Sequence, residues 1–119
     1  MPALLFDPPY YAVIFTAQRT EGDEPAYART AALMDQLAAK APGYLGIEST
    51  RDPNNGLGIT VSYWRDEAAI QAWKTQADDV MARQAGRDRW YASYALRVAK
   101  VEREYDFHKP KSDAGSASA

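Results

Sequence analysis

Residues 52–64 read DPNNGLGITVSYW, and this stretch decides the fold class. The turn residues 52–56 end in Asn-Gly, a pair that tolerates the left-handed backbone angles needed to close a tight hairpin. In residues 57–64, apolar or aromatic side chains occupy every second position: Leu57, Ile59, Val61 and Tyr63. This period of two predicts a strand with two different faces, and we expect residues 44–50 to form a second strand before the turn.

The segment upstream of the hairpin predicts a strand followed by a helix. The β-branched and aromatic run at residues 10–17 favours a strand. Asp23 is expected to cap the next helix at its N-terminus, with Pro25 in the first turn. Apolar residues then recur at helical spacing over residues 27–41, and the pair at 42–43, Pro-Gly, ends the helix.

The segment downstream of the hairpin predicts a second helix and a last strand. Asp66 is a candidate N-cap, and an apolar stripe follows it at Ile70, Trp73, Ala77 and Val80 or Met81. Gly86 is the expected end of this helix, and Asp78-Asp79 marks a place where a break is conceivable. The run at residues 90–105 suits a helix or a strand in its middle. We predict a strand, because one parity collects Tyr94, Leu96 and Val98.

The order β-α-β-β-α-β predicts an α+β fold of the ferredoxin-like type, an antiparallel sheet with both helices on one face. Residues 1–9 form a lead-in, residues 10–107 the single domain, and residues 108–119 a disordered tail rich in Ser, Ala, Gly and Lys. The uncovered sheet face still carries apolar groups, so we expect a second copy to cover it in a two-fold homodimer. The last strand is long enough for its end to reach that partner.

Composition narrows the function. The chain has 119 residues, 46% of them hydrophobic and 25% charged, with a net charge of −2, which gives no electrostatic reason to expect nucleic acid. With no Cys there can be no disulfide, thiolate metal site or Cys nucleophile, and the lone histidine, His108, lies beside the tail, so we expect no metal. The first residues carry no basic segment followed by an apolar run, and no run of about 20 apolar residues occurs, so we expect no signal peptide and a cytoplasmic protein without membrane contact.

Four segments in order carry a resemblance to a known family. They are residues 42–49 (PGYLGIES), 56–64 (GLGITVSYW) and 70–74 (IQAWK), followed by the run 86–103 that ends in RVAKVER. Together they resemble the antibiotic biosynthesis monooxygenase (ABM) superfamily, and more narrowly its branch of small uncharacterised bacterial proteins, over residues 10–105. The resemblance implies a dimeric α/β barrel. It also implies kinship with oxygenases that act on phenols or quinols without metal or flavin, with haem-degrading enzymes, and with members of no established activity.

The sequence departs from the haem-degrading relatives after Trp73. Those relatives carry a histidine one helix segment later, where the nearest positions here are Asp79 and Arg83. The related branch has His-x-x-Ala-Gln where this chain has Asp-Val-Met-Ala-Arg, so both its His and its Gln are replaced. The replacement of these residues therefore argues against haem chemistry in this chain, and we expect no cofactor.

Aromatic residues are the first candidates for binding a substrate, since the chain holds three Trp, eight Tyr and three Phe. Trp73 matches the functional Trp of several relatives, and it either stacks on a planar ligand or packs in the core with its stripe. Trp64 either lines the mouth of a pocket or covers the edge of the core. Tyr63 is its neighbour, so the two point to opposite sides of the sheet and at most one of them reaches a given pocket.

Charged residues are the second candidates. Arg97 lies mid-strand, where it either favours a substrate phenolate or forms a salt bridge between subunits. Asp78, Asp79 and Arg83 either supply a base or form a solvated helix face.

Three functions remain open from the sequence. The first is a cofactor-independent monooxygenase acting on an electron-rich aromatic such as a quinol or anthrone, which requires aromatic walls and one or two polar groups. The alternative is a non-catalytic dimeric domain that binds a small hydrophobic molecule or acts in a stress response. The third is a haem-binding or haem-degrading protein, which the missing histidine disfavours.

Overall fold

A computed structural model describes residues 5–84 and 87–110 of the chain. Its elements are β1 (Tyr10–Arg19), α1 (Glu24–Lys40), β2 (Tyr44–Arg51), β3 (Leu57–Trp64), α2 (Glu67–Arg83), the short 3₁₀ helix η1 (Arg87–Arg89) and β4 (Tyr91–Val101). The predicted order β-α-β-β-α-β is confirmed. The expected helix end at Gly86, the first four residues of the lead-in, and residues 111–119 of the expected disordered tail lie outside the described residues.

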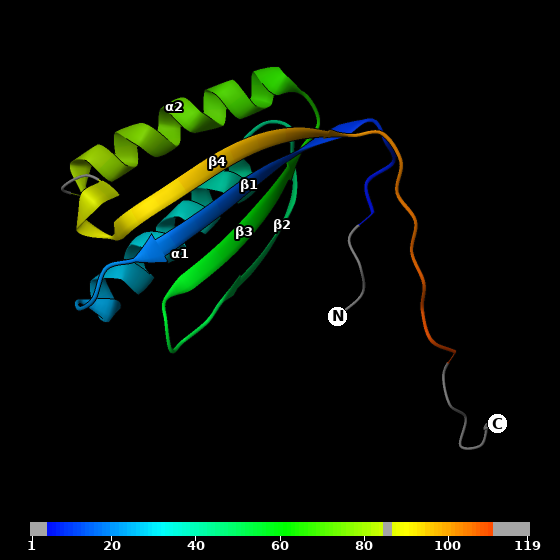
Figure 1. The fold of residues 1–119 in the computed structure, drawn as a ribbon. Helices are drawn as coiled ribbons and strands as arrows, with labels where there is room; N and C mark the ends of the chain where they lie inside the picture. The colour runs from blue at the N-terminus through cyan, green and yellow to red at the C-terminus, as the bar shows by residue number, and fades with distance from the viewer. Residues whose placement is uncertain (1–4, 85–86, 111–119) are drawn as a thin grey trace.

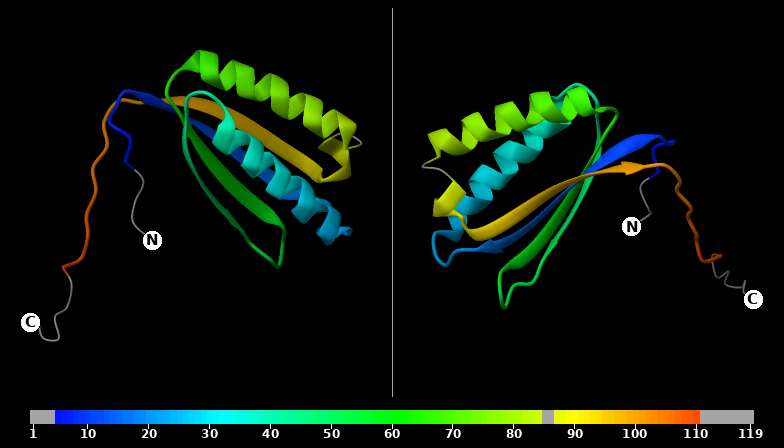
Figure 2. Two further views of the ribbon diagram at one scale, coloured as in Figure 1. Left: turned by 180° about the vertical axis from the view of Figure 1, so that it is seen from behind. Right: turned by 45° about the horizontal axis from the view of Figure 1, so that its top comes forward.

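The four strands form one antiparallel sheet in the order β2-β3-β1-β4. Both helices pack on the same face of this sheet, and the second face carries neither of them (Figures 1 and 2). The ferredoxin-like fold class predicted from the sequence is therefore confirmed. No helix within residues 5–84 and 87–110 is long and apolar enough to cross a membrane.

The register of β1 assigns each parity to a face. Val13 pairs with Ser62 of β3 and belongs to the same buried cluster as Ile70 of α2, so this parity faces the helices. The next residue, Ile14, pairs with Val61 and faces the other way, because successive strand residues point to opposite sides. Below, these two sides are called the helix face and the outer face.

Of the two predicted N-cap side chains, Asp66 makes the expected hydrogen bond and Asp23 does not. The carboxylate of Asp66 accepts a hydrogen bond from the Ala69 amide at 2.8 Å, as an N-cap does. Asp23 also occupies the N-cap position of its helix, but its side chain makes no cap bond and instead pairs with Arg89 at 2.7 Å. The conceivable break at Asp78-Asp79 does not occur, since α2 is continuous to Arg83.

Large apolar side chains are exposed on both faces of the sheet, on the outer face along β3 and on the helix face along the edge strand β4, where Tyr94, Leu96 and Val98 are 41–48% exposed. Leu57 and Ile59 of β3 are 45% and 43% exposed on the outer face, which is unusual for large apolar side chains that alternate along a strand. The chain after β4 leaves the sheet as an extended segment (Figure 1). That segment presents Tyr105 and Phe107 to solvent.

Candidate functional site

A cavity of about 380 Å³ lies between the helix face of the sheet and the two helices. Its aromatic walls come from both layers of the fold: Phe15, Tyr27, Trp73, Tyr91 and Tyr94. Other apolar side chains also line it: Val13, Ala31, Met34, Ala38, Ile47, Ile70, Ala77, Met81 and Leu96. The sequence left the sidedness of the pocket open because aromatics occupy both parities, and the packing places this cavity on the helix face.

Trp73 is the predicted site residue that lines this cavity. It projects from α2, is half-buried, and stacks on Trp64 with 5.9 Å between ring centroids and 24° between ring planes. Trp64 is fully buried beneath it and donates its indole N–H to the Ser62 hydroxyl at 2.9 Å. The two interpretations of Trp73 therefore apply together, since the side chain packs on the core and also faces the cavity.

Tyr63 and Arg97 do not line the cavity, because both lie on the outer face. Tyr63 is the neighbour of the inward-facing Trp64, and its hydroxyl donates to a carboxylate oxygen of Glu48 at 2.6 Å. Burial first, and then this hydrogen bond, raise its pKa. Arg97 pairs in register with Ile14 and shares that residue's outward direction. The expectation that Tyr63 and Trp64 point to opposite sides is confirmed.

Asp79 and Arg83 also lie outside the cavity. They form an ion pair one helical turn apart, at 3.0 Å, with both side chains more than two-thirds exposed. This arrangement is the solvated helix face that the sequence offered as the alternative to a base. Their neighbour Asp78 does line the cavity, and its carboxylate pairs with Lys74 at 2.9 Å.

Asp35 is a cavity residue that the sequence reasoning did not single out. It lies on α1 as an exposed residue at the edge of the cavity, and partial burial of its carboxyl raises the pKa above the ordinary value of 3.8. A carboxylate that is costly to keep ionised binds protons more strongly, which suits a general base. The signal was present, because Asp35 occupies a position of the apolar stripe, four residues after Ala31 and three before Ala38.

Hydroxyl groups and the ammonium-bearing Lys74 supply the remaining polar lining. Thr30 of α1 and three residues of the sheet, Ser49, Thr60 and Ser62, line the cavity. The hydroxyl oxygen of Ser62 accepts from Trp64, which leaves its own hydrogen able to donate. Within residues 5–84 and 87–110, no group of three or more His, Cys, Asp or Glu side chains is placed to hold a metal ion. The arrangement can bind a flat apolar molecule and accept a proton from it.

Three similar proteins have related sequences or folds. The Bacillus subtilis (strain 168) protein YqjZ, which is uncharacterised, is 48% identical over 107 residues, covering 90% of this chain and 92% of its own. The jasmonate monooxygenase ABM of Pyricularia oryzae is 30% identical over 92 residues, which are 76% of this chain and 43% of that longer protein. SnoaB from Streptomyces nogalater, a cofactor-independent oxygenase, has a similar fold with a TM-score of 0.62 at 10% identity, covering 86% of this chain and all of that one.

The family model that matches the chain is that of antibiotic biosynthesis monooxygenase, over residues 10–80. The match covers more than half of the chain and includes β1, α1, the β2-β3 hairpin and most of α2. It agrees with the fold and with the family that the sequence motifs resemble. The chain therefore belongs to the antibiotic biosynthesis monooxygenase family.

Proposed function

We propose that the chain is a cofactor-independent monooxygenase that oxidises an electron-rich aromatic substrate, such as a quinol or an anthrone. The observation that carries this proposal is the aromatic-walled cavity with Asp35 among its lining residues. Family membership supports the reaction type, and the cavity supports the shape of the substrate. A volume of about 380 Å³ lies in the range of natural small-molecule sites.

The reaction balances without an added reductant. In an anthrone, the reacting ring methylene carbon loses two hydrogens and gains one oxygen atom from O₂, while the second oxygen atom leaves as water. All four electrons come from the substrate, so the balance requires no redox partner. The protein must therefore bind the ring, remove a proton to form the electron-rich anion, and exclude water.

We assign these tasks to residues of the cavity. Trp73 and the aromatic walls from the sheet stack on the ring and keep water away. Asp35 accepts the proton, because partial burial raises the pKa of its carboxyl and so increases its affinity for a proton. The Ser62 hydroxyl is able to donate to the oxygen that gains charge when the anion forms.

Oxygen uptake by the purified protein, with no added metal or flavin, tests the proposal. Hydroquinones, naphthohydroquinones and anthrones form the panel, and ¹⁸O₂ should place one labelled atom in the product. Asp35→Asn should slow uptake by about 10²-fold or more, the range expected for loss of a general base. The matched control is Gln36→Ala, an exposed neighbour on α1 that does not line the cavity, and it should retain the parent rate.

Two outcomes would favour one of the other functions over a monooxygenase. Tight binding of a planar phenol without turnover would support the non-catalytic binding domain. A Soret shift on haemin titration would support haem binding. Equal rates in Asp35→Asn and Gln36→Ala would remove Asp35 as the base.

We also propose that the outer face forms a homodimer interface. Support comes from Leu57 and Ile59, which are nearly half exposed on a face that neither helix covers. Light scattering at micromolar concentration should give twice the chain mass. Ile59→Lys should shift the mass toward the monomer, whereas Gln76→Lys on the exposed side of α2 should not.

A further inference from the structure

A second hollow, of about 290 Å³, adjoins one end of the aromatic cavity. The two share several lining residues, among them Phe15, Tyr27 and Tyr91. Beyond these shared walls, the second hollow is lined by Arg19 of β1 and Arg51 of β2. The aromatic cavity therefore leads to a pair of guanidinium groups.

Arg19 is held in place as a buried cation. Its side chain is only 4% exposed, and its guanidinium carbon lies 3.8 Å from the centroid of the Tyr27 ring. Its Nη1 donates to the Trp90 carbonyl oxygen at 2.7 Å. Its Nε is buried and has no hydrogen-bond partner. A buried donor without an acceptor costs free energy, so the contacts of Arg19 within the protein leave part of its hydrogen-bonding capacity unused.

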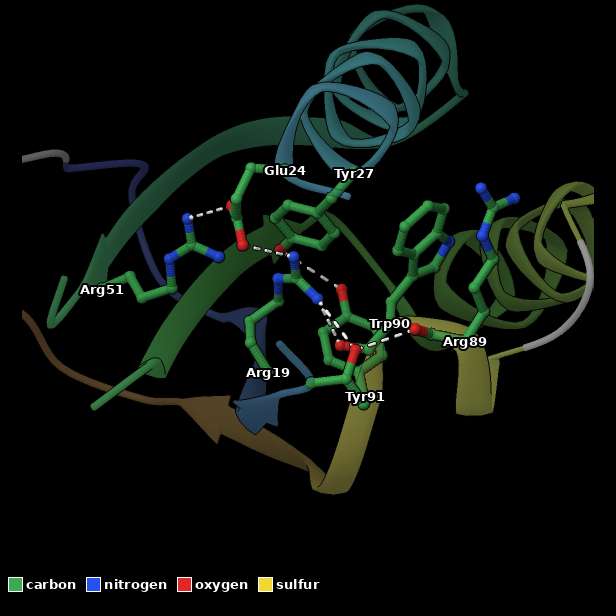
Figure 3. A network of polar contacts seen from close by, with 8 residues as sticks. Arg19, Glu24, Tyr27, Arg51, Arg89, Trp90 and Tyr91 are labelled. Atoms are coloured by element: carbon green, nitrogen blue, oxygen red, sulfur yellow. Dashed lines mark hydrogen bonds and ion pairs between the residues drawn. The ribbon is translucent and has the colours of Figure 1, made fainter. Parts of the chain in front are cut away.

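The carboxylate of Glu24 forms ion pairs with both arginines. Glu24 places one oxygen 2.7 Å from Nη2 of Arg19 and the other 3.3 Å from Nη2 of Arg51 (Figure 3). The neighbouring carboxylate of Asp23 is engaged by Arg89 at 2.7 Å. Two positive charges against one negative charge leave an excess of one at this end of the cavity. The contact to Arg51 is the longer one, and Glu24 is 57% exposed, so this carboxylate has room to turn toward solvent when another anion replaces it.

We propose that Arg19 and Arg51 form a binding site for a carboxylate group of the substrate, which takes the place of Glu24. A carboxylate fits because it is planar, carries two oxygens and matches the fork of a guanidinium. A monoanion also supplies the one negative charge that Arg19 and Arg51 lose once Glu24 has turned to solvent, so the excess of one positive charge is unchanged. Three hydroxyl residues, Ser49, Thr50 and Thr60, line the same hollow and complete its polar walls.

The site defines a substrate class. The ligand is an aromatic acid whose ring lies between Trp73 and the sheet, and whose carboxylate reaches past Tyr27 to the two arginines. This assignment rests on the proposed function only for the chemistry at the ring. Binding of the acid can be tested independently of the reaction, because it is measured without turnover.

Calorimetric titration with 2-naphthoate and with its neutral analogue 2-naphthamide tests the site. The parent protein should bind naphthoate at least tenfold more tightly than the amide. Arg51→Gln should remove most of this preference, with about a tenfold or greater loss for the acid and little change for the amide. Arg51 is exposed on an edge strand, so circular dichroism should show a retained fold.

Two further variants sharpen the result. Arg103→Gln changes the net charge equally but lies beyond β4, at the end of the sheet away from Arg19, and should leave both affinities unchanged. Glu24→Gln should tighten naphthoate binding, because the competing carboxylate is gone. Equal affinity for acid and amide in the parent protein, or weaker naphthoate binding in Glu24→Gln, would overturn the proposal. Naphthoate binding without oxygen uptake on any phenol would instead contradict the monooxygenase assignment and leave the acid site intact.

Discussion

Gly43 should tolerate substitution less than the other glycines of positive φ that the structure describes, Gly22 and Gly56. It links α1 to β2 with a positive φ of 80°, and a Cβ added there would lie 2.6 Å from the Cβ of Ala69 in α2. An alanine in the left-handed region costs roughly 1–2 kcal/mol, and overpacking at a rigid contact costs roughly 1–3 kcal/mol more. Gly43→Ala should therefore lower the free energy of unfolding by about 2–5 kcal/mol, a large part of the 5–15 kcal/mol typical of a domain.

Urea unfolding followed by circular dichroism, at one fixed protein concentration, measures this loss. Gly22→Ala is the matched control, because Gly22 has a φ of 90° but nothing within 4 Å of the added Cβ. The control should lose only the backbone part, about 1–2 kcal/mol. Adding Ala69→Gly to Gly43→Ala should restore about 1–3 kcal/mol relative to additivity. Equal losses for Gly43→Ala and Gly22→Ala, with no coupling to Ala69, would refute the reasoning.

Three other predictions concern the cap, the outer face and the proposed base. Asp66→Ala should cost about 1 kcal/mol of unfolding free energy in urea, because the Ala69 amide loses its acceptor, and Asp66→Asn should cost clearly less. Burial and the hydrogen bond to Glu104 raise the pKa of Tyr10 from 10.0 to about 12, so stability present below pH 10 should fall between pH 10 and 12. Tyr10→Phe should flatten this fall when unfolding is compared at pH 9 and pH 11.5, and an unchanged slope would contradict the assignment. Because burial raises the pKa of Asp35, its ionised form opposes folding above the ordinary value of 3.8, so Asp35→Asn should raise the unfolding midpoint at pH 7 but not at pH 3.

Local patterns predicted the fold well because each depends on neighbours along the chain. The alternation in residues 57–64 and the Asn-Gly turn before them specified the hairpin, and β3 begins and ends at those residues. Asp66 was identified as a cap because the acceptor and its amide are three residues apart. The strand choice for the run after residue 90 was correct, since β4 covers residues 91–101.

The site was predicted less completely, because alternation distinguishes two faces of a strand without saying which one the helices cover. That choice depends on the side to which the chain crosses over, a property of the whole fold. Arg97 was therefore as reasonable a candidate as Trp73 in the sequence, although the packing turns it to the outer face. Asp35 carried a readable signal, but its raised pKa comes from the burial that the folded structure provides.

The sequence by itself determined the order of elements, the two-faced strands and the family, since these depend on periods of two and 3.6 residues and on short motifs. Only the tertiary structure decided which side chains share the cavity. Arg19, Glu24 and Arg51 come from β1, α1 and β2, and no spacing along the chain indicates that one carboxylate lies between two arginines. The physical reason is that side-chain direction is a local property, whereas proximity between distant segments is produced by the packing of helices on a sheet.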